Sequence, residues 1–526
     1  QPRTLKMTTL LNHHRRPWQR PALQLVPQLV SILLLLLAAA VAGPVAAGGV
    51  PTPASPLHLY TPAAEFERAV VRAVADCPPG TAVVGHTPSG LPVVTVHTAG
   101  RSEAARDDEH AVRGMLLFGE HARELVTSEL ALVVLADLCA ALGSKGGGAG
   151  AAAALLQRFS DVAGGGGGTG GATAVASAAA TAVAEVAASR AYTLLVVPLA
   201  NAWGRSRVQG GDMCRRTNAH DVDLNRNYDA HWLPRAPTTP ADSNPGPAPF
   251  SEGETQDVRS LMDEFRPHVF LSVHSGAVGM YTPPAYTTTP PPTSAAAAAR
   301  DAMVGVLRRV AADTSAGGSV PVGAAASQLG YLCPGTCLDY SFDNARARFA
   351  FAFEIFDRSS APAPPPSTLG RSGGAHATLA RFAAARPARL EHTDLTPVTL
   401  SSCFMRGTAA ARSDGTQLLE VGGADQRGAG ATAQLLRGAG TGDASSGART
   451  GTGAVAAGGR TIATQLAADG SLSALMTPDE CLSFFNPVTR AELDATLSVW
   501  RARVFKLLQH AHAGVTTAAA AAVGSS

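Results

Sequence analysis

Four mostly apolar runs, separated by longer segments, constrain the fold of this chain most strongly. They occupy residues 115–118, 192–197, 268–273 and 349–355. Short apolar runs without alternating polar residues are typical of interior strands that are covered on both faces of a sheet. Helical patterns occur between them at residues 125–142, 251–265 and 295–312. The alternation predicts an α/β fold: a mixed central β-sheet flanked by helices on both faces, with low-complexity insertions.

The chain of 526 residues is expected to hold one such domain together with segments of biased composition. The domain is predicted to cover residues 57–400. Its Gly- and Ala-rich insert at 144–190 is expected to have no need to pack, and residues 408–475 are expected to form a low-complexity disordered insert. Residues 478–512 regain a helical pattern and are predicted to dock on the domain.

The N-terminal residues 1–48 resemble a targeting segment. Arg15, Arg16 and Arg20 precede an apolar run at 29–42, which small residues follow. This order is typical of a secretory signal peptide, so a secreted protein or one in the lumen of the secretory pathway is expected. The run is shorter than the roughly 20 residues of a spanning helix, which makes a retained signal anchor, and thus membrane attachment, the lesser alternative.

Charge and cysteine content narrow the function classes. The formal net charge is +2 and no dense basic run occurs, which argues against a nucleic-acid partner. Seven cysteines in a secreted chain suggest disulfides, and the odd number leaves at least one thiol unpaired or paired with a partner. Cys333 and Cys337, on either side of Pro334 and Gly335, are candidates for a short loop staple.

Candidate metal ligands lie where the apolar runs end. His121 and Glu124 occupy a strand-to-helix turn, a spacing at which an imidazole and a carboxylate can face one metal ion. Alone, this pair is a weak signal, because most such pairs are a histidine in a turn and an acid in the first turn of a helix. His274 ends the third run and offers a third ligand. Glu354 lies near the end of the fourth, where an unpaired carboxylate would be costly.

These segments, taken together, resemble those of the zinc metallocarboxypeptidase family of the carboxypeptidase A/B type. The likeness covers roughly residues 57–357. In chain order the matching segments are His121-Ala122-Arg123-Glu124, Asp223-Leu224-Asn225-Arg226-Asn227, His274-Ser275, Tyr331 with Asp339 eight residues later, and Phe351-Ala352-Phe353-Glu354. Five ordered segments rarely agree by chance.

The resemblance implies a cofactor and a catalytic group. His121, Glu124 and His274 would bind one Zn²⁺, and Glu354 would act as the general base. An arginine would stabilise the oxyanion. Both Arg215 and Arg216 can be aligned with it; Arg216 is favoured because it lies nine residues before Asn225, as in the regulatory branch of the family.

The resemblance also implies how a substrate would be held. Asn225 and Arg226 would bind the terminal carboxylate of a peptide, and Arg123 would contact the peptide further upstream. Tyr331 would close over the bound residue. Asp223 would orient His121.

The predicted substrate is the C-terminus of a peptide or protein. Leu338, just before Asp339, would line the base of the side-chain pocket, and Ala352 would add a small apolar wall. No acidic group is expected there, so a hydrophobic or aromatic C-terminal residue is the predicted preference. The predicted function is that of a zinc-dependent carboxypeptidase, the alternative being a catalytically inactive peptide-binding relative. A zinc amidase or acylase is disfavoured by Asn225, Arg226 and Tyr331.

Overall fold

A computed structural model describes most of the predicted domain and the C-terminal segment. The described residues are 55–99, 111–144, 147–162, 170–189, 191–358, 396–399, 408–411, 417–420, 432–435 and 476–523. The predicted signal segment 1–48 lies outside them, as does most of the predicted insert 408–475. The N-terminal signal therefore stays a prediction.

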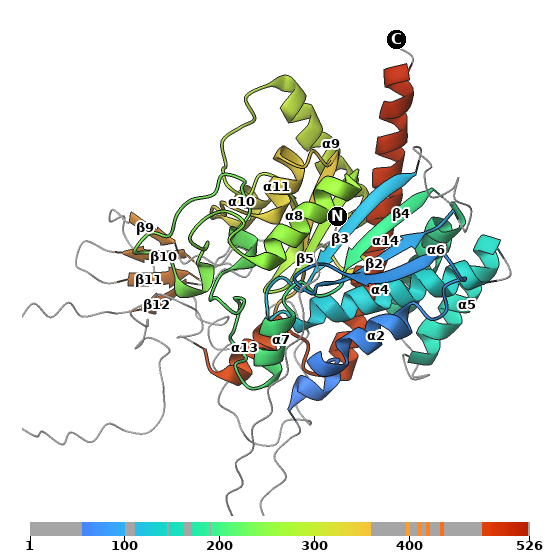
Figure 1. Cartoon of the computed structure of the whole chain (residues 1–526), viewed down its shortest axis with the longest axis horizontal. Coiled ribbons are helices and arrows are strands. Elements are labelled where there is room, and N and C mark those ends of the chain that lie inside the picture. The colour runs from blue at the N-terminus through green and yellow to red at the C-terminus, as the bar shows by residue number, and fades with distance from the viewer. Residues whose placement is uncertain are drawn as a thin grey trace, which may run out of the picture. The chain divides into compact units, whose positions relative to one another are not determined.

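Eight strands form the central sheet (Figure 1), in the order β1-β2-β4-β3-β5-β8-β6-β7. Their bounds are β1 (Ala82–His86), β2 (Pro92–His97), β3 (Val112–Phe118), β4 (Tyr192–Val197), β5 (Val269–His274), β6 (Ala277–Thr282), β7 (Val322–Ala324) and β8 (Phe349–Phe356). The four central strands, β4, β3, β5 and β8, are parallel neighbours. The pairings β1–β2, β2–β4 and β6–β8 are antiparallel. The four apolar runs are thus the parallel centre of a mixed sheet.

Helices cover both faces of this sheet. Their bounds are α2 (Phe66–Ala73), α4 (Leu125–Gly143), α5 (Gly147–Val162), α6 (Gly170–Ser189), α7 (Ala202–Gln209), α8 (Gly253–Phe265), α9 (Ser294–Asp313), α10 (Ala325–Leu329), α11 (Cys337–Asp343), α13 (Pro478–Phe485) and α14 (Arg490–Val523). Residues of α4, α6, α9 and α14 build the hydrophobic core on one face, whereas α8 and α11 contribute to the core on the other. The predicted fold class is confirmed.

The strands divide their side chains between these cores. In β3, Leu116 and Phe118 belong to the larger core, while Met115 and Leu117 belong to the smaller one. Successive side chains of a strand point to opposite faces, so an apolar run without polar breaks supplies both cores at once. This is why the sequence of β3 shows no alternation.

Helix α4 is the one described helix that is long and apolar enough to cross a membrane, by length and composition alone. It has a buried share of 67% in its most apolar stretch. Leu130, Val134 and Leu138 pack in the core on the sheet. Burial of this kind is what a central core helix requires, and it accounts for the composition of α4.

The prediction that residues 144–190 have no need to pack is wrong. Most of the segment forms α5 and α6, and Ala179, Val183 and Val186 of α6 are fully buried. Gln509 of α14 donates a hydrogen bond to the Ala182 carbonyl at 3.1 Å. Alanine is the strongest helix former and leaves a smooth apolar surface, so an Ala-rich segment can form a tightly packed helix despite its low complexity.

The prediction that residues 408–475 are disordered throughout also differs from the structure. Four short strands, β9 (Thr396–Thr399), β10 (Thr408–Ala411), β11 (Gln417–Glu420) and β12 (Thr432–Leu435), form an antiparallel sheet. Strands of four residues are too short to show a two-residue period against a Gly- and Ala-rich background. The remaining residues of this insert lie outside the described part of the chain.

The cysteines pair differently from the predicted staple. Disulfides join Cys77 to Cys139 and Cys214 to Cys481. Cys333 is also disulfide-bonded, whereas Cys337 is a buried free thiol, so the two do not pair with each other. Cys337 begins α11, and its sulfur faces the Glu120 carboxylate, not Cys333. The predicted unpaired thiol is therefore present, at Cys337.

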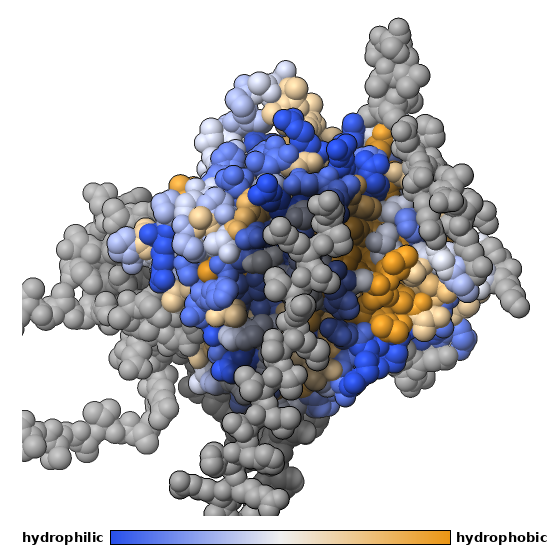
Figure 2. Space-filling view, viewed as in Figure 1, coloured by the Kyte–Doolittle hydropathy of each residue, from blue (hydrophilic) through white to orange (hydrophobic). Residues whose placement is uncertain are grey.

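The face of the molecule shown in Figure 2 is mostly hydrophilic, with a hydrophobic area over the part where Figure 1 draws β2 and α4. The large hydrophobic side chains that are exposed include Val71 of α2 and Val83 and Val84 of β1. Strand β1 is the last strand on its side of the sheet. Scattered exposed side chains of this size are common on protein surfaces and assign no function here.

Candidate active site

Three predicted metal ligands converge at the carboxyl ends of the central strands. His121 and Glu124 come from the turn between β3 and α4, and His274 is the last residue of β5. His121 Nδ1 lies 2.7 Å from Glu124 Oε1 and 3.2 Å from His274 Nδ1. His274 Nδ1 lies 3.3 Å from Glu124 Oε2. Two ring nitrogens and one carboxylate therefore face one point, although they are 153 residues apart at the extremes.

The backbone conformation at Gly119 explains how the turn between β3 and α4 can direct His121 and Glu124 toward His274. Gly119 ends β3 with φ +68°, and a Cβ there would lie 2.6 Å from Ser128 Oγ and 2.9 Å from Leu199 Cδ1. Only glycine fits this left-handed, tightly packed position. Glu124 follows as the N-cap of α4 without capping it through its side chain, so the carboxylate is available to the cluster.

The electrostatics of the cluster favour the protonation states in which its side chains can bind a metal ion. Burial alone would raise the pKa of Glu124, but contacts first with His121 and then with His274 lower it below its ordinary value. Burial lowers the pKa of His274 and outweighs its contact with Glu124. An ionised carboxylate and a neutral imidazole are the forms that bind a metal ion.

The donor set fits zinc. Glu124, His121 and His274 are buried and offer ligand atoms that all lie within 4.8 Å of one another. Two imidazoles and one carboxylate, with a fourth position left for water or substrate, are typical of catalytic zinc sites. The three residues predicted as ligands are thus placed where one ion can bind them all.

Asp223 lies behind His121, the residue that the resemblance implies it would orient. Its Oδ1 is 3.2 Å from His121 Nε2, the ring nitrogen that faces away from the cluster. Its Oδ2 accepts a hydrogen bond from Arg216 Nε at 2.8 Å. Burial would raise the pKa of Asp223, but Arg216 and then Arg226 hold it well below the ordinary value. Asp223 therefore remains ionised and can hold both neighbours in place.

The two arginines that can both be aligned with the oxyanion arginine occupy different environments. Arg216 is buried, and its Nη1 lies 3.2 Å from His121 Nδ1 and 3.6 Å from Glu124 Oε1. Arg215 instead pairs with Asp212 and Asp221 and lies over the ring of Trp203. Arg216 is thus the arginine beside the predicted metal ligands.

Glu354 lies beside His274 on the neighbouring strand, in register with it. Its Oε2 accepts a hydrogen bond from the Ala277 backbone N–H at 3.2 Å. Burial, reinforced by the charge of Glu124, raises its pKa well above the ordinary value. A buried carboxyl group with a raised pKa can both take up and release a proton during a reaction.

Three polar atoms at this site have no hydrogen-bond partner among the described residues. They are Glu354 Oε1, Arg216 Nη2 and Arg226 Nη2. Buried polar groups are nearly always satisfied, so three unsatisfied atoms around one cluster indicate that the site binds something else. A carboxyl group and two guanidinium groups suit a water molecule and carboxyl or carbonyl oxygens of a ligand.

Asn225 and Arg226 lie in the short 3-10 helix η3 (Leu224–Arg226), and the Asn225 amide nitrogen is 3.3 Å from Nε2 of His274, a predicted metal ligand. Arg226 Nη1 donates to the Asn225 carbonyl at 2.8 Å. Gly335 lies against this turn: with φ +78°, its added Cβ would be 2.3 Å from the Arg226 carbonyl oxygen. The loop that follows Tyr331 is thereby held close to Arg226.

Tyr331 and Leu338 share a small apolar cluster. Its members are Tyr281, Ala285, Ala325, Leu329, Tyr331, Cys333, Leu338, Ala350 and Ala352. Leu338 is fully buried and Tyr331 nearly so. Burial lowers the pKa of Arg226, and Asp223 and, more weakly, Tyr331 oppose this shift, so the Tyr331 side chain lies near Arg226. Tyr281 was not predicted from the sequence, because a tyrosine in an apolar strand carries no motif.

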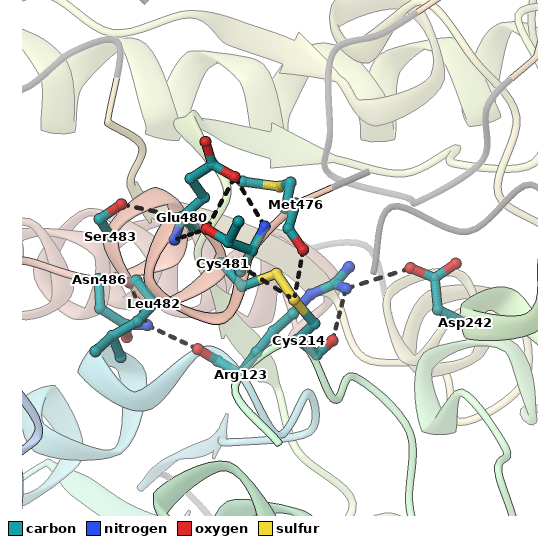
Figure 3. The surroundings of a disulfide bond; sticks show 10 residues. Arg123, Cys214, Asp242, Met476, Glu480, Cys481, Leu482, Ser483 and Asn486 are labelled. Carbon is teal, nitrogen blue, oxygen red and sulfur yellow. Dashed lines mark hydrogen bonds and ion pairs between the residues drawn. A yellow bond between two sulfur atoms is a disulfide. The ribbon is translucent and has the colours of Figure 1, made fainter. Parts of the chain in front are cut away.

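Arg123 is covered, which the sequence did not predict (Figure 3). Its guanidinium carbon lies 4.3 Å from the centre of the Phe485 ring, in α13. Its Nη1 donates to the Cys214 carbonyl at 3.1 Å and to Asp242 Oδ2 at 3.3 Å. Asn486 donates to the Arg123 carbonyl at 2.8 Å. The predicted contact of Arg123 with a peptide remains a prediction.

The disulfide between Cys214 and Cys481 ties α13 to the loop that carries Arg216. It joins residues 267 apart, so replacing both cysteines by serine should lower the free energy of unfolding by about 2 to 5 kcal/mol. Urea unfolding would measure this, and kcat should fall as well because the Arg216 loop loosens.

The other disulfide provides a matched control. Cys77 and Cys139 are 62 residues apart and contribute no predicted site residue. Replacing them by serine should lower stability with kcat unchanged. If removal of Cys214 and Cys481 left both stability and kcat at the wild-type values, the structural role of this link would be refuted.

A polar group behind His274 was also not predicted from the sequence. Glu120, Tyr228 and Cys337 are buried there, and Glu120, His274 and Cys337 form a second set with the spacing of metal ligands. Glu120 stands directly before His121, at the end of an apolar strand. A carboxylate there is costly to bury, so its position could have indicated a buried polar site. Tyr228 and Cys337 come from distant segments, and nothing in the sequence around them indicated such a site.

Several solved structures resemble the chain. Thrombin-activatable fibrinolysis inhibitor matches with 17% identity and a TM-score of 0.40, over 57% of this chain and 66% of that one, just under two thirds. Its bovine form, in complex with tick carboxypeptidase inhibitor, matches with 17% identity and a TM-score of 0.39, over 57% and 86%. Carboxypeptidase A from Helicoverpa armigera matches with 19% identity and a TM-score of 0.40, over 63% and 72%.

Residues 175–376 match the sequence profile of the zinc carboxypeptidase family. The matched region includes Asp223, Arg226, His274 and Glu354, whereas the segment with His121 precedes it. No curated protein matches the chain. The resemblance to zinc carboxypeptidases that the motifs predicted is confirmed by the profile over these residues.

Proposed function

We propose that this chain, whose residues 175–376 match the zinc carboxypeptidase family, is a zinc-dependent carboxypeptidase that hydrolyses the C-terminal bond of peptides or proteins. The observation that carries the proposal is the convergence of His121, Glu124 and His274 beside Glu354. An inactive peptide-binding relative is the alternative. The complete ligand set and the unpartnered Glu354 oxygen favour the enzyme.

His121, Glu124 and His274 would hold the ion. Bound there, zinc would supply Lewis-acid polarisation of the scissile carbonyl and would acidify water. Asp223 accepts from His121 Nε2 and so keeps the proton on the side of the ring away from the ion. The ligands therefore need little rearrangement to bind.

Glu354 would act as the base. Its Oε1 takes a proton from the attacking water as the water oxygen bonds to the carbonyl carbon. The same carboxyl group then gives this proton to the departing amine nitrogen as the C–N bond breaks. Arg216 Nη2, which has no partner among the described residues, would stabilise the negative oxygen in between.

Arg226 would make the reaction specific for chain ends. Its unpartnered Nη2 is a charged donor suited to a terminal carboxylate. Asn225 would assist with its amide, and Tyr331, close to Arg226, would cover the bound residue. An internal peptide bond offers no such carboxylate and would be rejected.

The C-terminal side chain would enter the cluster around Leu338. The Asp339 carboxylate is engaged within the protein, because it accepts hydrogen bonds from the Ala285 backbone N–H at 3.0 Å and from the Thr336 hydroxyl at 3.1 Å. Burial also raises the pKa of Asp339 to about 7, which weakens any negative charge there. A hydrophobic or aromatic residue is the proposed preference.

The test is hydrolysis of blocked dipeptides ending in Phe, Leu, Lys, Arg or Glu, with and without a chelator. Burial of an apolar side chain contributes about 1.5 to 3 kcal/mol, so kcat/KM for Phe or Leu should exceed that for Lys by about tenfold or more. Preference for Lys or Arg would refute the pocket argument. A zinc-loaded protein that cleaves none of the five would favour the inactive relative.

The proposal includes a location. An enzyme with the signal segment at residues 1–48 and disulfides such as Cys77–Cys139 would act outside the cell or in the secretory pathway. Retention of the apolar N-terminal run as a membrane anchor is the alternative. Its substrates would be peptide or protein C-termini in those compartments.

A further inference from the structure

A buried polar network lies behind His274, on the side of the ring away from the metal ligands. Glu120 is 2% exposed, and its Oε1 accepts a hydrogen bond from the Tyr228 hydroxyl at 2.8 Å. Its Oε2 lies 3.2 Å from Cys337 Sγ and 3.5 Å from His274 Nε2. None of these contacts takes part in the proposed hydrolysis.

The orientation of the His274 ring fixes where its proton must be. Nδ1 faces His121 Nδ1 and Glu124, so a metal ion bound there needs Nδ1 free and the proton on Nε2. The amide nitrogen of Asn225, 3.3 Å from Nε2, is a donor and cannot accept that proton. A flip of this amide is opposed by the Cys337 backbone N–H, which donates to Asn225 Oδ1 at 2.9 Å.

We propose that Glu120 is the positioning residue of His274. Its carboxylate attracts the Nε2 proton, which keeps Nδ1 free for the ion and holds the ring in its orientation. Tyr228 and Cys337 fix the carboxylate in turn. Asp223 has a comparable place behind His121, 3.2 Å from its Nε2, whereas Glu120 is 3.5 Å from Nε2 of His274. The inference rests on the proposed zinc function, because it assigns Glu120 a role toward that ion.

A second metal site is the competing interpretation of the same residues. Glu120, His274 and Cys337 offer ligand atoms within 4.8 Å of one another. An ion there would require His274 to give both ring nitrogens to metals, and it would compete with Tyr228 for the carboxylate. Positioning avoids this conflict and needs no second ion.

The test is the zinc affinity of Glu120→Gln, measured by chelator competition on the full chain. Glutamine keeps the shape and removes the charge, so Kd for zinc should rise by about 10- to 100-fold. The matched control is Glu129→Gln, a buried carboxylate paired with Arg205 at 2.6 Å, which should leave the zinc affinity unchanged. Wild-type affinity in Glu120→Gln would overturn the proposal.

Further measurements separate the remaining outcomes. Tyr228→Phe, which removes one hydrogen bond from Glu120, should weaken zinc binding in the same direction by a smaller factor, and it serves if Glu120→Gln does not fold. Cobalt-loaded wild type should contain one ion and show no thiolate-to-cobalt charge-transfer band. Two ions with such a band would overturn positioning in favour of Cys337 as a ligand. A wild type that binds no zinc would instead refute the proposed function itself.

Discussion

Glu354→Gln is expected to lower kcat by about 10²- to 10⁴-fold while the zinc content stays the same. Glutamine has nearly the size of glutamate but cannot take a proton from water at neutral pH. Because Glu354 Oε2 is held by the Ala277 N–H and only Oε1 is unpartnered, the replacement disturbs little else. Steady-state hydrolysis of a blocked dipeptide ending in Phe, together with metal analysis of the same sample, measures both quantities.

The zinc content is the internal control of this experiment. Glu354 is not among the three converging ligands, so one ion per chain should remain bound. A variant that keeps zinc and at least a tenth of the wild-type kcat would show that another group takes the proton. Loss of zinc together with activity would instead assign Glu354 to the ligand set.

Arg216→Ala is expected to lower kcat by about 10²- to 10³-fold with KM nearly unchanged, because an oxyanion develops only in the transition state. Arg216 is chosen because its Nη1 lies beside His121 and its Nη2 has no partner among the described residues. Measurement of kcat and KM on the same Phe dipeptide distinguishes this loss from weaker substrate binding.

The neighbouring arginine is the matched control. Arg215→Ala removes the same side chain one position earlier, where it pairs with Asp212 and Asp221 on the surface. It should leave kcat within a few-fold of wild type, and Arg216→Lys should retain more stability than Arg216→Ala because Asp223 keeps a cation. An equal loss in both alanine variants would contradict the assignment to Arg216.

The sequence was sufficient to predict the parallel centre of the sheet and the residues at its carboxyl edge. Parallel strands end at one edge, so residues that follow β3 and end β5 meet there whatever the length of the chain between them. His121 and His274 illustrate this, since they are 153 positions apart and their Nδ1 atoms are 3.2 Å apart. The choice between Arg215 and Arg216, by contrast, depends on which of the two side chains points toward His121 and Glu124, and the sequence does not show this direction.

The missed features share a physical reason. The packing of α6 depends on alanines that show no contrast between a buried and an exposed face, and the cover over Arg123 comes from Phe485, more than 350 residues later. The network of Glu120 joins three segments whose individual residues resemble ordinary core or turn positions. Tertiary contacts of this kind leave no local pattern in a sequence.

The central claim is that His121, Glu124 and His274 bind one zinc ion. Zinc-edge anomalous diffraction from crystals of the zinc-loaded protein tests it most directly. We expect a single peak, with two histidine nitrogens and one carboxylate oxygen at about 2.0 to 2.2 Å from the ion. A peak elsewhere, or one that His274 does not reach, would contradict it.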